Sequence, residues 1–118
     1  MHGSMKYLAA VSLLGLGAQA RAGDFVVDAT VTTISSSRNG GDAPFVIATT
    51  GGSGPCSNNM WIGFYPTDFT DAESYRRAYA QVMMAMAMGL KVRISGAAAT
   101  PSAANGDCWH ANNVMISP

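Results

Sequence analysis

The side chain best suited to proton transfer is His110, because the other histidine, His2, stands near the start of the chain. A hydrolase would combine such a histidine with a nucleophilic serine, often on a Gly-x-Ser-x-Gly turn, and the sequence contains no such turn. A lone histidine close to a cysteine, here Cys108, is more often a packing or surface residue. We therefore predict that the protein is not an enzyme.

Three acidic residues, Asp68, Asp71 and Glu73, stand close enough in sequence to resemble a catalytic cluster. A helix start explains two of them. Thr70 and Glu73 have the spacing of a capping box, and Asp71 favours the positive end of the helix dipole. The glycine-rich stretch 51–54 lacks the lysine and hydroxyl of a phosphate-binding loop, so no cofactor is expected.

Methionine is the third residue type with chemistry of its own, because copper(I) prefers soft thioether ligands. Segment 83–88 holds four methionines, of which only Met84 and Met88 fall together on the outer side of a helix. No third ligand is evident nearby, so we predict no metal site. Periplasmic copper(I) handling through Met84, Met88 and His110 stays open as a third hypothesis.

The first residues have the order of a secretory signal peptide. A basic start at Lys6 precedes an apolar run over residues 8–18, and Ala20-Arg21-Ala22 fits the pattern that signal peptidase accepts. Ala18-Gln19-Ala20 is an alternative cleavage site. We predict a signal peptide at 1–22, one domain at 23–118, and an exported product that is periplasmic or secreted.

Cleavage would leave five basic and seven acidic side chains and a net charge of about −2. This balance argues against nucleic-acid binding, which needs a basic surface. No second apolar segment is long enough to cross a membrane, so no span is expected after cleavage. Cys56 and Cys108 are the two cysteines, and an even count in an exported chain predicts a structural disulfide.

These groups must be positioned by the elements of one small domain. Alternating and β-branched residues predict strands at 25–34, 45–49, 60–65, 91–95 and 113–117. In the first strand, Val27, Ala29, Val31 and Thr33 alternate with Asp28, Thr30 and Thr32. The capping box predicts a helix that runs to about Met88 and ends at Gly89. Asn39-Gly40 is expected at the centre of the first turn.

The expected fold is mainly β with one helix, in the order β-β-β-α-β-β, and carries one disulfide. This is the order of an OB-fold, a five-stranded Greek-key barrel. A small α+β sandwich with the same order remains open. Of the two tryptophans, Trp61 is expected in the core and Trp109 is the better candidate for exposed stacking.

The helix has apolar residues on two sides. A period of about 100° per residue places one stripe against the core. That stripe holds Tyr75, Tyr79, Val82, Met83, Met86 and Leu90, with Ala78 and Ala85 at its edge. The opposite side holds Arg77, Gln81, Met84 and Met88, and exposed apolar neighbours of this kind indicate a contact surface. The alternatives are self-association through the helix and local cover by a loop.

The order of several features resembles the B subunits of subtilase-cytotoxin and pertussis-like AB5 toxins. The features are Cys56, the following strand with Trp61, the helix with Tyr75, Tyr79 and Ala80, and the segment Gly89-Leu90-Lys91-Val92-Arg93-Ile94. The similarity covers residues 25–95. It implies an OB-fold, a pentamer with helices around a central pore, and recognition of cell-surface glycans.

The chain departs from that family at the sugar site. The family's sialic-acid serine corresponds to Asp28 or Ala29, and its aromatic residue after the fourth strand to Ser95-Gly96. An acid there would repel a sialic carboxylate. We predict ligand contacts at Asp28, Thr30, Ser95, Trp109 and His110, and an oligomer interface at Arg77, Gln81, Met84 and Met88.

The leading hypothesis is an exported, non-enzymatic binding protein of toxin B-subunit type that recognises a glycan or a host or envelope surface ligand. The alternative is a stand-alone secreted or periplasmic structural protein or antigen with no toxin partner.

Overall fold

The structure is a computed structural model and describes residues 21–36, 44–58 and 60–118. Most of the predicted signal peptide, and the turn centred on Asn39-Gly40, lie outside these residues. The strands are β1 (Asp24–Ser36), β2 (Phe45–Thr50), β3 (Ile62–Phe64), β4 (Lys91–Gly96) and β5 (Ala111–Ser117). The remaining elements are α2 (Ala72–Met88) and three short 3₁₀ turns, η1 (Pro66–Asp68), η2 (Ala103–Asn105) and η3 (Asp107–Trp109).

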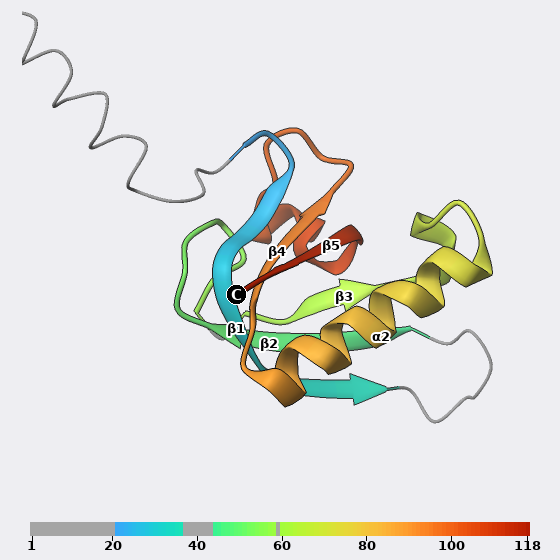
Figure 1. The fold of residues 1–118 in the computed structure, drawn as a ribbon. Helices are drawn as coiled ribbons and strands as arrows, with labels where there is room; N and C mark the ends of the chain where they lie inside the picture. Colours follow the sequence, from blue (N-terminus) through green and yellow to red (C-terminus); the bar gives the residue numbers. More distant parts are fainter. Residues whose placement is uncertain (1–20, 37–43, 59) are drawn as a thin grey trace, which may run out of the picture.

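The strands form one antiparallel sheet in the order β3-β2-β1-β4-β5. Figure 1 shows the sheet curling, with α2 crossing one of its faces. The prediction of a mainly β fold with one helix is confirmed. β3 and β5 also contact each other, but among the described residues no register pair joins them. The closed OB barrel therefore stays a prediction.

The long first strand is the centre of the sheet and changes partner along its length. Its first part pairs with β4 (Val26 opposite Ile94) and its last part pairs with β2 (Ile34 opposite Ile47). Thr30 is paired on both sides. Register shifts between residues 26 and 29 and between 31 and 33 bend the strand.

The same shifts interrupt the regular alternation of β1. Val27, Ala29 and Val31 are buried, but Thr33, the next residue in the alternation, is exposed. The bulge between residues 31 and 33 adds a residue and reverses the side on which the following side chains lie.

One apolar core lies between the sheet and α2. Phe45 is central to it: its ring stacks on that of Phe64 with centroids 4.5 Å apart, and meets the ring of Tyr79 edge-on at 4.9 Å. The other large buried side chains are Phe25, Val26, Ile47, Ile62, Val82, Val92 and Ile94. Burial of each such side chain contributes about 2 kcal/mol.

A charged pair joins β1 to β4 at their edge of this core. Arg93 Nη2 donates to Asp24 Oδ2 at 2.7 Å, and the two side chains are only 15% and 6% exposed. The guanidinium holds the pKa of the Asp24 carboxyl below its ordinary value. The pair thus fixes the start of β1 against β4.

The helix begins one residue later than the predicted capping box. Asp71 is the N-cap, and its side chain accepts from the backbone N–H of Ser74 at 2.7 Å. This bond lowers the pKa of the Asp71 carboxyl. The assignment of Thr70 as N-cap with Glu73 as its partner was wrong, because a carboxylate is the stronger acceptor for a first-turn amide. Gly89 ends the helix in the left-handed conformation, as predicted (φ 67°).

The buried side of α2 also differs from the predicted stripe. Tyr75, Ala78, Val82 and Ala85 are its buried residues. Met83 and Met86 were expected in the core, but their side chains are 47% and 44% exposed. Ala78 and Ala85 therefore take core positions, and the two methionines lie outside the core.

The predicted disulfide between Cys56 and Cys108 is present, with both residues buried. The third strand is shorter than predicted, and Trp61 lies just before it with 43% of its side chain exposed, so its placement in the core was wrong. Within β3, the residue between the buried Ile62 and Phe64 is Gly63, and Trp109 packs against it. Among the helices of the described part, none is long and apolar enough to cross a membrane.

Candidate binding site

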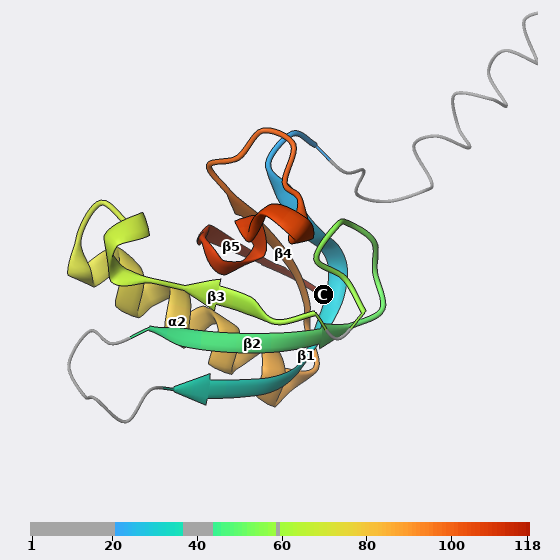
Figure 2. The same ribbon diagram turned by 180° about the vertical axis from the view of Figure 1, so that it is seen from behind.

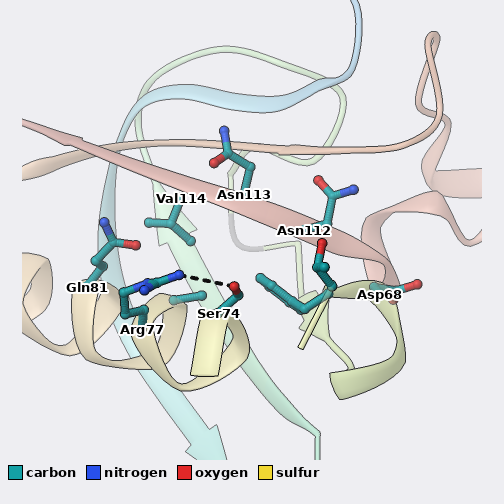
Figure 3. Close-up of a pocket in the computed structure, with 10 residues that line it drawn as sticks. Asp68, Ser74, Arg77, Gln81, Asn112, Asn113 and Val114 are labelled. Atoms are coloured by element: carbon teal, nitrogen blue, oxygen red, sulfur yellow. Dashed lines mark hydrogen bonds between the residues drawn. The ribbon is translucent and has the colours of Figure 1, made fainter. Parts of the chain in front are cut away.

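A polar pocket of about 430 Å³ opens between the first half of α2, the turn η1 and strand β5 (Figure 3). The polar side chains around it come from all three elements. They are Asp68, Thr70, Ser74, Arg77, Gln81, Asn112 and Asn113. Phe69, Ala78 and Val114 supply the apolar part of the lining, and Ala78 and Val114 belong to the buried core.

The helix supplies a cation held in place by its neighbours. Arg77 Nη2 donates to Ser74 Oγ at 3.1 Å, one turn earlier on the helix. Its other terminal nitrogen, Nη1, stands 3.6 Å from Glu73 Oε1. Both partners of this ion pair are largely exposed, so it contributes little to stability. Its consequence is local: the guanidinium charge beside the pocket is partly compensated.

The opposite end of the pocket carries an acid that is also paired. Asp68 Oδ2 lies 2.9 Å from His110 Nδ1. Figure 3 shows the Asp68 carboxylate turned away from Arg77 and Ser74. The His110 ring stacks on that of Tyr65 with centroids 5.5 Å apart. The predicted contact residue His110 therefore stands just outside the pocket and is linked to it through Asp68.

Ser95 has a similar indirect position. Asn113 Nδ2 donates to Ser95 Oγ at 3.3 Å, so the hydroxyl on β4 supports an asparagine that lines the pocket. Asp28 and Thr30 do not line it. Thr30 Oγ1 accepts from Lys91 Nζ at 3.0 Å, and Asp28 is exposed on β1 in a left-handed conformation (φ 57°). The structure thus separates the five predicted ligand contacts into different regions.

Two residues predicted for an oligomer interface, Arg77 and Gln81, line the pocket. Met84 and Met88 continue the same side of α2 and are strongly exposed, Met88 at 66%. A shallower apolar hollow of about 320 Å³ lies on the other side of the helix, lined by Ile34, Tyr79, Met83, Met86 and Ala87. Exposed methionines therefore flank the second half of α2 on both sides.

Sequence reasoning did not single out Ser74, Asn112 or Phe69 as site residues. The pocket depends on the contact between α2 and β5, two elements that no local pattern brings together. Asn112 and Asn113, near the start of the last strand, could have indicated a binding site, because asparagine is disfavoured in strands and its presence there suggests another role.

The arrangement offers hydrogen-bond donors and acceptors over a small apolar floor. Hydroxyl and amide groups of Ser74, Gln81 and Asn112 can each donate and accept. Within residues 21–36, 44–58 and 60–118, no group of three His, Cys, Asp or Glu side chains could hold a metal ion. The pocket is suited to binding a neutral polar molecule.

The model of a family of unknown function, DUF5992, matches residues 5–118 of the chain. No curated protein and no solved structure matches it.

Proposed function

The chain belongs to DUF5992, a family of unknown function, and we propose that it is an exported, non-enzymatic protein that binds a neutral glycan in the pocket between α2, η1 and β5. The observation that carries this proposal is the lining of the pocket. It combines several amide and hydroxyl groups with charges that are already paired within the protein.

A sugar ring fits this lining better than an anion does. Its hydroxyls both donate and accept, which matches Ser74, Gln81 and Asn112. Arg77 has Glu73 and Ser74 as neighbours and Asp68 contacts His110, so both charged side chains of the lining already have partners within the protein. Phe69 is the partly exposed apolar residue of the lining and can contact the C–H face of the ring.

Export is supported by two features. The sequence of residues 1–22 has the order of a signal peptide, and the Cys56–Cys108 disulfide forms and persists in an oxidising compartment. His110 is not part of the pocket lining and contacts it only through Asp68, so we assign binding and no catalytic role to the pocket.

Binding to a glycan array tests the proposal directly. The exported chain, purified with its disulfide intact, is expected to bind neutral glycans. Gln81→Ala and Asn112→Ala are each expected to weaken that binding about tenfold, the effect of losing one or two hydrogen bonds. Met115→Ala is the matched control, because Met115 is exposed on β5 and does not line the pocket. An array without hits would refute glycan recognition.

Self-association through α2 is the second part of the proposal. It is supported by the exposure of Met84 and Met88 on the helix, where apolar side chains gain most from a partner surface. Assembly of toxin B-subunit type would place these helices against one another. Light scattering on the purified chain tests it, and a monomer at all concentrations would exclude this assembly.

A further inference from the structure

The outer side of β3 carries a second surface that the pocket does not use. Ile62 and Phe64 are fully buried and point into the core. Successive side chains of a strand alternate between its two sides, so Trp61, Gly63 and Tyr65 lie together on the outer side. Trp61 is 43% exposed there.

Gly63 leaves a gap in this side of β3, and Trp109 fills it. A Cβ placed on Gly63 would stand 2.7 Å from Trp109 Cε3 and 2.9 Å from the Trp109 carbonyl oxygen. The indole therefore lies against bare backbone, while 40% of the side chain remains exposed. Figure 2 shows the 3₁₀ turns after β4 lying next to β3, which is where this contact forms.

From Tyr65, a series of side-chain contacts leads to the pocket. Trp109 lies against Gly63, and Gly63 is two residues from both Trp61 and Tyr65 along the chain. The Tyr65 ring stacks on His110, and His110 contacts Asp68 at the end of the pocket. We call Trp61, Trp109, Tyr65 and His110 the aromatic row.

The row is held in one arrangement before any ligand arrives. Cys108 precedes Trp109 and is bonded to Cys56, and Met60 Sδ lies 3.7 Å from Cys108 Sγ next to Trp61. Aromatic side chains have few rotatable bonds, so their ordering on binding costs little entropy. A surface of this kind is organised for stacking.

We propose that the aromatic row is an extension of the binding site, and that the ligand is a linear neutral oligosaccharide with its end in the polar pocket and its following sugars across the row. The proposal rests on the proposed function, because the pocket must bind a sugar for a chain to continue from it. Each pyranose ring has a C–H face that stacks on an indole or phenol and hydroxyls that remain in water. The row supplies flat rings and has no charge of its own beyond the His110–Asp68 pair.

The chain contains its own reporter for this site. Its two tryptophans, Trp61 and Trp109, are both in the row, so the intrinsic tryptophan emission reports on the row alone. The probes are cello-, malto- and chitooligosaccharides, each from the single sugar to long oligomers, titrated into the exported chain. In the series that binds, affinity is expected to rise at least tenfold with length, and only the longer members should change the tryptophan emission.

Variants separate the row from the pocket. Trp61→Ala and Trp109→Ala are each expected to lower the affinity for long oligomers about tenfold, which is the effect of losing one stacking contact. The affinity for the single sugar should not change. Gln81→Ala should weaken all lengths. Trp61→Ala is expected to fold normally, because Trp61 lies outside the core. Met115→Ala is the control, because Met115 is an exposed apolar residue on another strand.

The outcomes distinguish the two proposals. Binding of the single sugar with no gain from length, or unchanged binding of long oligomers to both tryptophan variants, would overturn the aromatic extension and leave the pocket proposal standing. No binding of any sugar would overturn both. Binding of a proline-rich peptide to the row in place of sugars would assign the row to a protein partner and overturn the extension.

Discussion

Two surfaces of this protein expose apolar side chains, and they are built in opposite ways. The aromatic row gathers Trp61, Tyr65, Trp109 and His110 from two separate segments. The methionine face is our name for the exposed Met83, Met84, Met86 and Met88, which lie on both sides of the second half of α2 and come from less than two turns of it. The row needs the tertiary structure in order to exist, whereas the methionine face needs only a helix.

The difference extends to stiffness. Tyr65 and His110 stack on each other, and Trp109 packs on the bare backbone of Gly63 next to the disulfide-bonded Cys108. Methionine has three rotatable side-chain bonds and a polarizable sulfur, and it adapts to irregular partners. A stiff surface selects a ligand by shape, and an adaptable surface suits association with a protein surface. The comparison teaches that one small domain can hold both kinds of surface on separate elements.

Removal of the disulfide should affect the row most strongly. Cys56→Ser combined with Cys108→Ser is expected to lower the free energy of unfolding by about 4 kcal/mol, because the unfolded chain regains the entropy that the long closed loop had lost. Urea unfolding followed by tryptophan emission measures this loss, with the reduced wild-type chain as control. An unchanged unfolding midpoint would show that the bridge does not stabilise the folded domain that carries the row.

The ion pair between Asp24 on β1 and Arg93 on β4 belongs to neither surface, so its removal tests the stability of the sheet alone. Asp24→Asn removes the carboxylate that compensates the mostly buried Arg93, and should cost about 3 kcal/mol. Thermal unfolding of the variant at neutral pH measures this, with Asp28→Asn as the exposed control on the same strand. Equal stability of the two variants would contradict the expected role of the pair.

The same pair gives a pH dependence with a definite sign. The folded pKa of Asp24 lies below its ordinary value of 3.8. Its contribution to stability is therefore complete above that value and is lost as the pH falls through the lower, folded pKa. Acid unfolding of the wild type should show this loss, and Asp24→Asn should lack it.

A methyl group at Gly63 should damage the row and spare the methionine face. Gly63→Ala is expected to cost about 2 kcal/mol, because its Cβ would overlap both the ring and the backbone of Trp109. The shift in tryptophan emission is the measurement, and Gly89→Ala would be a poor control because Gly89 is left-handed. Ala87→Gly, an exposed change on α2, is the better comparison. An unshifted emission would contradict the contact between Gly63 and Trp109.

The smallest effect on folding is expected from the methionine face. Met84→Gln combined with Met88→Gln should change the free energy of unfolding by less than about 0.5 kcal/mol, because both side chains are exposed. Light scattering should show a smaller assembly than the wild type forms at the same concentration. Met115→Gln serves as the control. Unchanged assembly would place any interface elsewhere.

The fold could be predicted to a large extent because its signals are local. β-branched alternation located the strands, Gly89 marked the helix end, and the two cysteines left a single pairing. The errors arose where two local signals competed. Asp71 displaced Thr70 as the cap, and the bulge in β1 exposed Thr33.

The candidate site could be predicted only in part. His110 and Trp109 were singled out because their residue types are rare in the chain. Their neighbours Asp68 and Gly63 are distant in sequence, and no periodicity reports such a meeting. Gly63 did carry a signal, since glycine within a short apolar strand indicates a close approach of other atoms. The same signal would have argued against a buried Trp61.

The double pairing of β1 has a consequence for how the chain acquires its structure. β1 can form a hairpin with β2 early, because only a short segment separates them, but its first part must wait for β4, which follows after the whole of α2. Closing so long a loop is slow compared with forming a helix or a hairpin. During synthesis, Phe25 and Val26 would emerge first and be covered late. The most vulnerable period of this protein is therefore the interval before β4 arrives, when the strand at the centre of the finished sheet is still an open edge.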